Sequence, residues 1–325
     1  MVLCALCVVC VFFRGCERSP ERRVVLYTSI DEPIARPIIR DFEKQTGIRV
    51  TLVTDSEASK TVGLAERLRA EKSNPQADVY WGNEPFHTIN LAEEGVLVAY
   101  ESPSAKDVDL RYRDWAYRWT GNALRARVIG ISSWDAANVA TQGLEGLLDA
   151  RLKGKVAIAR PTAGTTGGHV AALFVVWGEE RATDYFRRMR ANEVMVVGGN
   201  SVVADLVAKG TALAGLTDND DVAAAASQGG KISPILPDQG TFGTLMIPTS
   251  VGLVDGARNA DNAKNLIDYL LSPEVERKLI DAKFAGWGVR GTFDVKAMDV
   301  DYREVARVMP HAVRRATAIL EGREP

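Results

Sequence analysis

Eight short runs of apolar residues, many of them β-branched, alternate with helical patterns along the chain. They are VVLYTS (24–29), RVTLV (49–53), DVYW (78–81), RVIGI (127–131), KVAIA (155–159), VMVV (194–197), ALAGL (212–216) and ISPIL (232–236). Each run is brief and nearly all apolar, which is typical of strands that helices cover on both faces. Strands that alternate with helices form α/β domains, so we predict an α/β fold with mainly parallel sheets.

Two helical patterns have clear boundaries. Ile34, Ile38 and Phe42 recur every four residues and place one buried stripe on a helix that Gly47 ends. The segment Ser272-Pro273-Glu274 has a capping residue followed by proline, which is typical of a helix start. Both patterns predict amphipathic helices that pack against a sheet.

Length and charge limit the classes of function. The chain of 325 residues is 46% hydrophobic and 25% charged, so it can bury sizeable cores, and its length suggests two domains. The formal net charge of −2 is spread along the chain and gives no electrostatic basis for binding nucleic acid or an anionic membrane surface. Any function that depends on charge must therefore be local.

The N-terminal segment has the pattern of an export signal. All four cysteines (Cys4, Cys7, Cys10 and Cys16) lie in this segment, so the folded part contains no disulfide. Residues 2–13 form an apolar run that is too short to span a bilayer as a helix. The Gly-Cys junction that follows resembles the lipobox of bacterial lipoproteins. We predict a signal peptide over residues 1–16, with Cys16 as the candidate lipidation site, and a tether over residues 17–23; the alternative is an uncleaved anchor.

Acidic and amide side chains follow several predicted strands, at the sheet edge where ligands bind in open α/β folds. They are Asp31 and Glu32, Asp55 and Glu57, Asn83 and Glu84, and Asp218, Asp220 and Asp221. Each one could simply cap a helix, because such side chains accept the free N–H groups of a first turn. The surplus of carboxylates in residues 217–221 costs stability through repulsion unless a cation or water relieves it. Carboxylates on converging loops suit a hard cation or an organic ammonium group.

Two glycine-rich segments are candidates for anion contacts. GTTGGH (164–169) lies between a strand and an apolar helix, and GGNS (198–201) precedes another helix. Glycine lets backbone N–H groups approach an anion, although a tight turn at a helix start explains either segment equally well. The residues expected to make anion or secondary contacts are Lys60, Thr165, Thr166 and Asn200.

Catalytic motifs are not recognised. His87, His169 and His311 lack metal-ligand spacing, and the chain has no G-x-S-x-G segment. We therefore predict that the protein is not an enzyme, with a hydrolase that uses paired carboxylates as the alternative. Three tryptophans are candidates either for the core or for the wall of a cleft: Trp81, Trp115 and Trp119.

Four stretches carry a resemblance to a known family. They are VVLYTSIDEPIARPIIRDFEKQTGIRV, ADVYWGNEPFHTINLAEEGVL, GNSVVADLVAKGTALAGLTDNDD and LIDYLLSPEVERKL, of which the last is quite specific. Through them the chain resembles the extracellular solute-binding proteins of iron(III)-type ABC importers, which are type II periplasmic binding proteins. The resemblance implies two lobes, each a mainly parallel sheet flanked by helices, with the ligand captured in a cleft between them by hinge closure. It places residues 24–122 and 247–292 in lobe 1, and residues 123–246 and 293–325 in lobe 2.

The resemblance also implies a ligand site. The ferric site of this family typically uses a histidine after the first strand, an acidic residue after the third, and two adjacent tyrosines in the other lobe. By position these fall on Asp31, on Asn83 or Glu84, and on Asp220 with Asp221, so aspartate replaces the tyrosine pair. We expect a hard cation in an acidic cleft, with ferric iron as the family-based guess. The expected ligands are Asp31, Glu32, Glu57, Asn83, Glu84, Asp218, Asp220 and Asp221.

The partners expected from the resemblance are those of a transporter. The protein would capture a small solute or metal ion in the periplasm or elsewhere outside the cytoplasm and deliver it to an ABC permease driven by a separate ATPase. It would act as a monomer without a catalytic cofactor or nucleic acid, and reach the membrane only through a signal segment or lipid anchor. The alternatives are a small organic solute, cationic or phosphonate- or phosphate-like through a metal, a lipid-anchored hydrolase, or a sensor ectodomain of the same fold.

Overall fold

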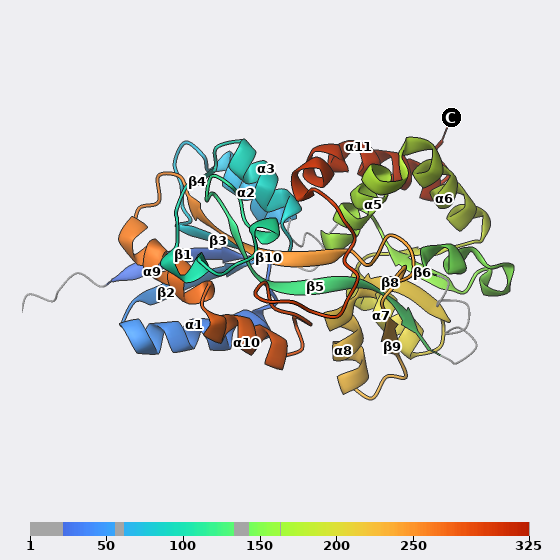
Figure 1. The fold of residues 1–325 in the computed structure, drawn as a ribbon, viewed down its shortest axis with the longest axis horizontal. Coiled ribbons are helices and arrows are strands. Elements are labelled where there is room, and N and C mark those ends of the chain that lie inside the picture. The colour runs from blue at the N-terminus through green and yellow to red at the C-terminus, as the bar shows by residue number, and fades with distance from the viewer. Residues whose placement is uncertain (1–21, 56–61, 133–142, 163, 325) are drawn as a thin grey trace, which may run out of the picture.

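The computed structural model describes residues 22–55, 62–132, 143–162 and 164–324. Two groups of strands and helices lie side by side, joined by two long strands that run through the middle of the molecule (Figure 1). These strands are β5 (Thr120–Ile131) and β10 (Met246–Val254), which pair with each other in antiparallel orientation. The strand order is β2-β1-β3-β10-β5-β8-β6-β7.

The first group is built around the N-terminal strands. β1 (Arg23–Thr28) pairs in parallel with β2 (Arg49–Thr54) and β3 (Val79–Gly82), and β4 (Leu97–Val98) pairs with β10. Its helices are α1 (Glu32–Thr46), α2 (Val62–Ala70), α3 (Phe86–Glu93), α9 (Ala260–Leu270) and α10 (Pro273–Asp281). The three parallel strands therefore end at one edge, next to the crossing strands.

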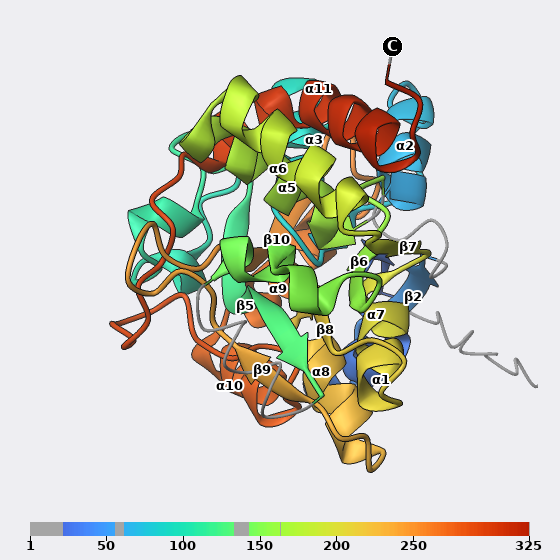
Figure 2. The ribbon, with the colours of Figure 1, turned by 90° about the vertical axis from the view of Figure 1, so that its right-hand side faces the viewer.

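The second group repeats this plan. β6 (Val156–Ala159) pairs in parallel with β7 (Met195–Val197) and β8 (Ala214–Asp218), while β8 and β9 (Ser233–Ile235) run antiparallel to β5. Its helices are α5 (Gly164–Trp177), α6 (Glu179–Ala191), α7 (Asn200–Ala208) and α8 (Asn219–Ser227). The last helix, α11 (Tyr302–Leu320), lies on α5 and α6 (Figure 2).

Both predicted helix boundaries are confirmed. Gly47 adopts a left-handed conformation with φ of 69°, and its N–H donates to the carbonyl of Glu43, which ends α1. The Ser272 hydroxyl accepts a hydrogen bond of 3.3 Å from the N–H of Val275 at the start of α10. The stripe of α1 is buried at Ile38 and Phe42 and half-buried at Ile34.

The structure departs from the predicted elements in the middle of the molecule. The predicted run 127–131 is only the second half of β5, and β4 and β10 were not predicted. The glycine segment 164–169 forms the first turns of α5 instead of a turn that precedes a helix. Of the three tryptophans, Trp81 and Trp119 are buried, whereas Trp115 is largely exposed.

Candidate functional site

Two buried arginines of β5 meet the acidic segment that follows β8. Nη2 of Arg125 lies 2.7 Å from Oδ2 of Asp218 and 3.0 Å from Oδ1 of Asp220. Nη1 of Arg127 lies 2.7 Å from Oδ1 of Asp218, so the two guanidinium groups bind opposite oxygens of one carboxylate. Arg125 is 3% exposed and Arg127 is fully buried. Because a buried charge is costly unless it is paired, each of these groups requires the others.

Hydroxyl and amide groups complete the shell around Asp218. Thr165, in the first turn of α5, donates a hydrogen bond to Oδ2 of Asp218, and Nδ2 of Asn200 donates to the same oxygen at 3.1 Å. Thr166 donates to Oδ1 of Asn200 at 3.0 Å. Three predicted contact residues, Thr165, Thr166 and Asn200, are thus brought together, and they hold the Asp218 carboxylate in place.

The electrostatic balance keeps this network charged. Burial opposes ionisation of Asp218, but the charges of Arg127 and Arg125 outweigh burial and lower the pKa of the carboxyl group. Burial likewise opposes the charged form of Arg125, yet Asp220, Asp218 and Asp221 outweigh it and raise the pKa of the guanidinium group. Two guanidinium groups thus face the three carboxylates of Asp218, Asp220 and Asp221.

The three aspartates also form a compact group of oxygen donors. One carboxylate oxygen from each of Asp218, Asp220 and Asp221 lies within 4.8 Å of the other two. Such spacing suits a cation with oxygen ligands. Two of the three carboxylates, however, already accept hydrogen bonds from the buried arginines. A metal ion would have to compete with those bonds.

Next to this network lies a small inner cavity, whose walls come from both groups of elements. Asn83 follows β3, Arg125 lies on β5, and the N-terminal residues of α5 and α7 face the same space. Gly164 and Thr165 line it at the start of α5, and Gly198, Gly199 and Asn200 at the start of α7. Helix N-termini present free N–H groups and a partial positive charge. The inner cavity therefore combines two helix N-termini with a buried arginine and the carboxylates of Asp218 and Asp221.

A second, outer cavity adjoins the inner one through Asp221, which lines both. It has a volume of about 270 Å³ and is lined by Asp31, Asp220 and Asp221 together with Lys283 and Phe284. Arg125 lies over the Phe284 ring, with its guanidinium carbon 5.0 Å from the ring centre. Three carboxylates thus line the outer cavity, whereas the inner one has two carboxylates together with the two helix N-termini.

The remaining predicted ligands have separate roles or lie elsewhere. Glu84 is buried and accepts hydrogen bonds from the N–H groups of Phe86 and His87 at the start of α3, as a helix cap would. Glu32 forms an ion pair with Arg36 and does not line either cavity. Asn83 lines the inner cavity, and its carbonyl accepts from Arg125 at 3.2 Å. The predicted residues Cys16, Glu57 and Lys60 lie outside the described residues.

Sequence reasoning missed the two arginines, although the sequence carries a signal for them. Arg125 and Arg127 are two positions apart in the part of β5 from Ala123 to Ile131, which is otherwise apolar, so they face the same side of the sheet. Two charged residues on one face of a buried strand require opposite charges nearby. The three aspartates after β8, which runs antiparallel to β5, satisfy that requirement.

A buried histidine supports the same network. His169 lies on α5, and its Nδ1 atom is 3.4 Å from Nε of Arg127, so this nitrogen accepts from the guanidinium group. Burial and then the charge of Arg127 lower the pKa of His169 from 6.5 to about 3. The imidazole is therefore neutral at ordinary pH and adds no charge to the site.

The chain has two lobes joined by crossing strands, and a polar cleft lies beside the crossing. This is the architecture of the two-lobed periplasmic binding proteins. Solved structures of this class superpose on the chain. The Campylobacter jejuni ferric binding protein matches with a TM-score of 0.80 at 21% identity, over 91% of this chain and 99% of that one. AfuA from Actinobacillus pleuropneumoniae, with fructose-6-phosphate bound, matches with a TM-score of 0.77 at 23% identity, over 93% and 97%. At these identities the likeness establishes the fold alone.

Residues 23–284 match the model of the bacterial extracellular solute-binding protein family, and the chain belongs to that family. It is 28% identical over 262 residues to an uncharacterised protein of Haemophilus influenzae, covering 78% of this chain and 73% of that one. It is 27% identical over 290 residues to a Salmonella typhimurium periplasmic protein provisionally named as 2-aminoethylphosphonate-binding, covering 86% and 77%.

Membership of this family confirms the prediction of a transport binding protein. The protein is the extracytoplasmic solute-binding component of an ABC importer and is not an enzyme. Components of this kind work with a membrane permease and an ATPase. Within the described part of the chain, the helices are all too short or too polar to cross a membrane.

Proposed function

We propose that the cleft binds a small organic phosphonate or phosphate ester that carries an ammonium group. The observation that carries this proposal is the position of Arg125, which is buried beside the glycine-rich N-termini of α5 and α7 in one cavity. Neither helix has an acidic residue in its first turn to compete for the N–H groups. A buried arginine between two helix N-termini is suited to a multiply charged oxyanion.

The outer cavity accounts for the ammonium group. Asp31, Asp220 and Asp221 line it, and Arg125 is bound to Asp220 but forms no ion pair with Asp31 or Asp221 among the described residues. Three carboxylates and one lysine, Lys283, thus line the outer cavity. A zwitterion would place its oxyanion in the inner cavity and its ammonium group near Asp221, which both cavities share.

The size of the inner cavity limits the head group. Its volume is about 30 Å³. A single water needs about 10–15 Å³ of such space, so the cavity suits a compact tetrahedral group and excludes a sugar ring. The ligands named for the relatives agree with an oxyanion, since one is named for 2-aminoethylphosphonate and one neighbour holds a sugar phosphate.

A hard cation is the second candidate, because the three aspartates offer oxygens within 4.8 Å of one another. This candidate corresponds to ferric iron, the ligand named for several neighbours. It is the weaker of the two, since Arg125 and Arg127 already bind two of those carboxylates. A trivalent cation would have to displace these guanidinium groups or lie next to their positive charge.

Thermal shift and calorimetry on the purified protein test the proposal, because a ligand that binds only the native state raises the melting temperature. The panel is 2-aminoethylphosphonate, ethylphosphonate without the amine, ethanolamine without the phosphonate, and ferric citrate. We expect 2-aminoethylphosphonate to bind at least about tenfold more tightly than either half-molecule. Stabilisation by the metal alone would overturn the proposal in favour of the cation.

A pair of variants locates the two ends of the ligand. Asp221→Asn should weaken binding of 2-aminoethylphosphonate while leaving binding of ethylphosphonate nearly unchanged, because only the former places an ammonium group near the carboxylate. Asp205→Asn is the matched control, since Asp205 lies exposed on α7 and pairs with Lys209. If Asp221→Asn weakened both compounds equally, the ammonium assignment would be wrong.

A further inference from the structure

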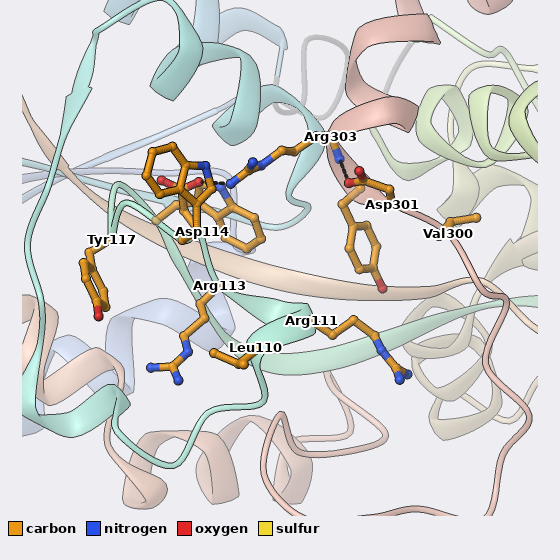
Figure 3. A pocket seen from close by; sticks show the side chains of 11 residues that line it. Leu110, Arg111, Arg113, Asp114, Tyr117, Val300, Asp301 and Arg303 are labelled. Carbon is orange, nitrogen blue, oxygen red and sulfur yellow. Dashed lines mark hydrogen bonds and ion pairs between the residues drawn. The ribbon is translucent and has the colours of Figure 1, made fainter.

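A separate cavity lies outside the cleft, between the segment that precedes β5 and the segment that leads into α11. Its volume is about 430 Å³, and it shares no residue with the two cleft cavities. Leu110 through Trp119 supply one side, and Val300 through Arg303 supply the other (Figure 3). A cavity of this size falls in the range of about 300–1,000 Å³ that is usual for small-molecule sites.

The apolar surface of this cavity is exposed, which is unusual for this protein. Among the described residues, four large hydrophobic side chains are exposed, and three of them line this cavity. They are Leu110 at 76%, Trp115 at 74% and Tyr117 at 38% exposed. Clustered exposed apolar groups mark binding surfaces, whereas scattered ones need no explanation. Buried Trp119 and Tyr302 add two aromatic rings to the lining.

The polar groups of the cavity hold its shape. Asp114 is buried and accepts hydrogen bonds from Arg118 at 2.7 Å and from Arg303 at 2.6 Å. The guanidinium carbon of Arg303 in turn lies 5.7 Å from the centre of the Trp115 ring. Asp301 accepts from the N–H of Arg303 as the cap of α11. Both acidic residues that line the cavity therefore already accept hydrogen bonds from Arg303. The guanidinium group of Arg303 also lies over the Trp115 ring.

Two arginines that line the cavity form no ion pair within the described part of the chain. Among the residues that the structure describes, neither Arg111 nor Arg113 forms an ion pair: Arg111 lies over the Tyr112 ring, and Arg113 donates from Nη1 to the carbonyl of Ala105 at 3.3 Å. Nε of Arg113 is buried without a hydrogen-bond partner in the described structure. Because this atom is buried, a ligand in the cavity would accept from the Nη atoms at the end of the guanidinium group instead. Figure 3 shows the two arginines on either side of Leu110.

We propose that this cavity is a second ligand site, for a small aromatic carboxylate. The planar body would stack on Trp115 and Tyr117, and the carboxylate would accept from Arg113, with Arg111 adding positive charge at the rim. The charge of the cavity selects against a cation, because its two carboxylates are bound and its two unpaired groups are guanidinium groups. This site does not depend on the ligand proposed for the cleft.

Calorimetric titration of the full chain tests the site with three probes of one shape: indole-3-acetate, neutral indole-3-acetamide and cationic tryptamine. We expect the carboxylate to bind at least about tenfold more tightly than the amide, as for a charge-assisted hydrogen bond, and tryptamine not to bind. Arg113→Gln should abolish the preference for the carboxylate, and Trp115→Ala should weaken the carboxylate and the amide alike. Arg314→Gln, an exposed arginine on α11, is the matched control and should change nothing.

The result that overturns the proposal is equal binding of the three probes, no binding at millimolar concentration, or binding that Arg113→Gln and Trp115→Ala leave unchanged. Asp221→Asn separates this site from the cleft, because it should leave indole-3-acetate binding intact. Thermal melting of each variant, without ligand, shows whether the fold is retained. A lost affinity in a variant that melts like the unmodified protein then reports on the site itself.

Discussion

Oδ2 of Asp218 lies 2.7 Å from Nη2 of Arg125, and both side chains are almost completely buried. This ion pair joins the strand that crosses between the lobes to the end of β8 in the second lobe. The acidic residues after β8 therefore serve two purposes. Asp218 binds the buried arginines and lines only the inner cavity, whereas Asp221 lines both cavities of the cleft.

This division predicts that two similar substitutions will lower the free energy of unfolding by very different amounts. Asp218→Asn removes the carboxylate that binds both Arg125 and Arg127, and should lower the free energy of unfolding by about 3–5 kcal/mol. Asp221→Asn should lower it by about 1 kcal/mol or less, since Asp221 binds neither Arg125 nor Arg127 and is less buried than Asp218. Urea denaturation without ligand measures both. Equal losses would show that the two aspartates are not divided in this way.

The buried histidine predicts a specific dependence of stability on pH. Because the pKa of His169 is about 3 in the folded protein and 6.5 in the unfolded chain, only the unfolded chain binds a proton between these values. Acidification from pH 7 to pH 5 should therefore cost about 2 kcal/mol of stability through this residue. His169→Gln should remove that loss, so the stability difference between variant and unmodified protein should shrink by this amount from pH 7 to pH 5.

The comparison with the variant is needed because another group acts in the opposite direction. Burial raises the pKa of Asp238 to about 6, so the folded protein binds a proton there before the unfolded chain does and gains stability as the pH falls below 6. The difference between His169→Gln and the unmodified protein cancels this contribution. A difference that stays constant with pH would show that His169 titrates normally.

A close contact between the lobes predicts that one substitution changes stability in a direction that depends on the neighbouring residue. A Cβ atom on Gly168 of α5 would lie 2.0 Å from Cε2 of Phe86 on α3. Gly168→Ala should therefore destabilise the protein by about 1–3 kcal/mol, although alanine is normally the better helix former. In a Phe86→Ala background the same change should be neutral or stabilising. Chemical denaturation of the four proteins in this cycle gives the coupling; its absence would refute the contact.

Local patterns predicted the outer parts of the fold and missed its centre. β1, β2 and β3 were found because each is a continuous apolar run that ends at polar residues. β10 was missed because Pro248, Thr249 and Ser250 interrupt its apolar pattern. In the structure Thr249 and Ser250 are buried, and both form hydrogen bonds with distant segments. Thr249 donates to Asn122, and Ser250 donates to the carbonyl of Glu84. No local pattern contains those partners.

The same limit applies to the cleft. The aspartates after β8 were identified from their excess over what helix capping needs, and Thr165, Thr166 and Asn200 were identified from glycine-rich helix starts. The arginines that bind these aspartates, Arg125 and Arg127, lie more than ninety positions before Asp218 and Asp220 in the chain. A cluster that looks like a cation site in isolation becomes largely neutral once those two residues are placed beside it.

The start of α10 offers a test of a feature that the sequence did predict. Ser272→Ala removes the hydroxyl that accepts from the N–H of Val275 and should cost about 1 kcal/mol of stability. The matched control is Ser73→Ala, because Ser73 is exposed and lies in a turn outside any helix. Urea denaturation of both variants measures the difference. Since neither Ser272 nor Ser73 lines either cavity of the cleft, ligand affinity should be the same in both variants. Equal stability of the two would show that the cap contributes nothing.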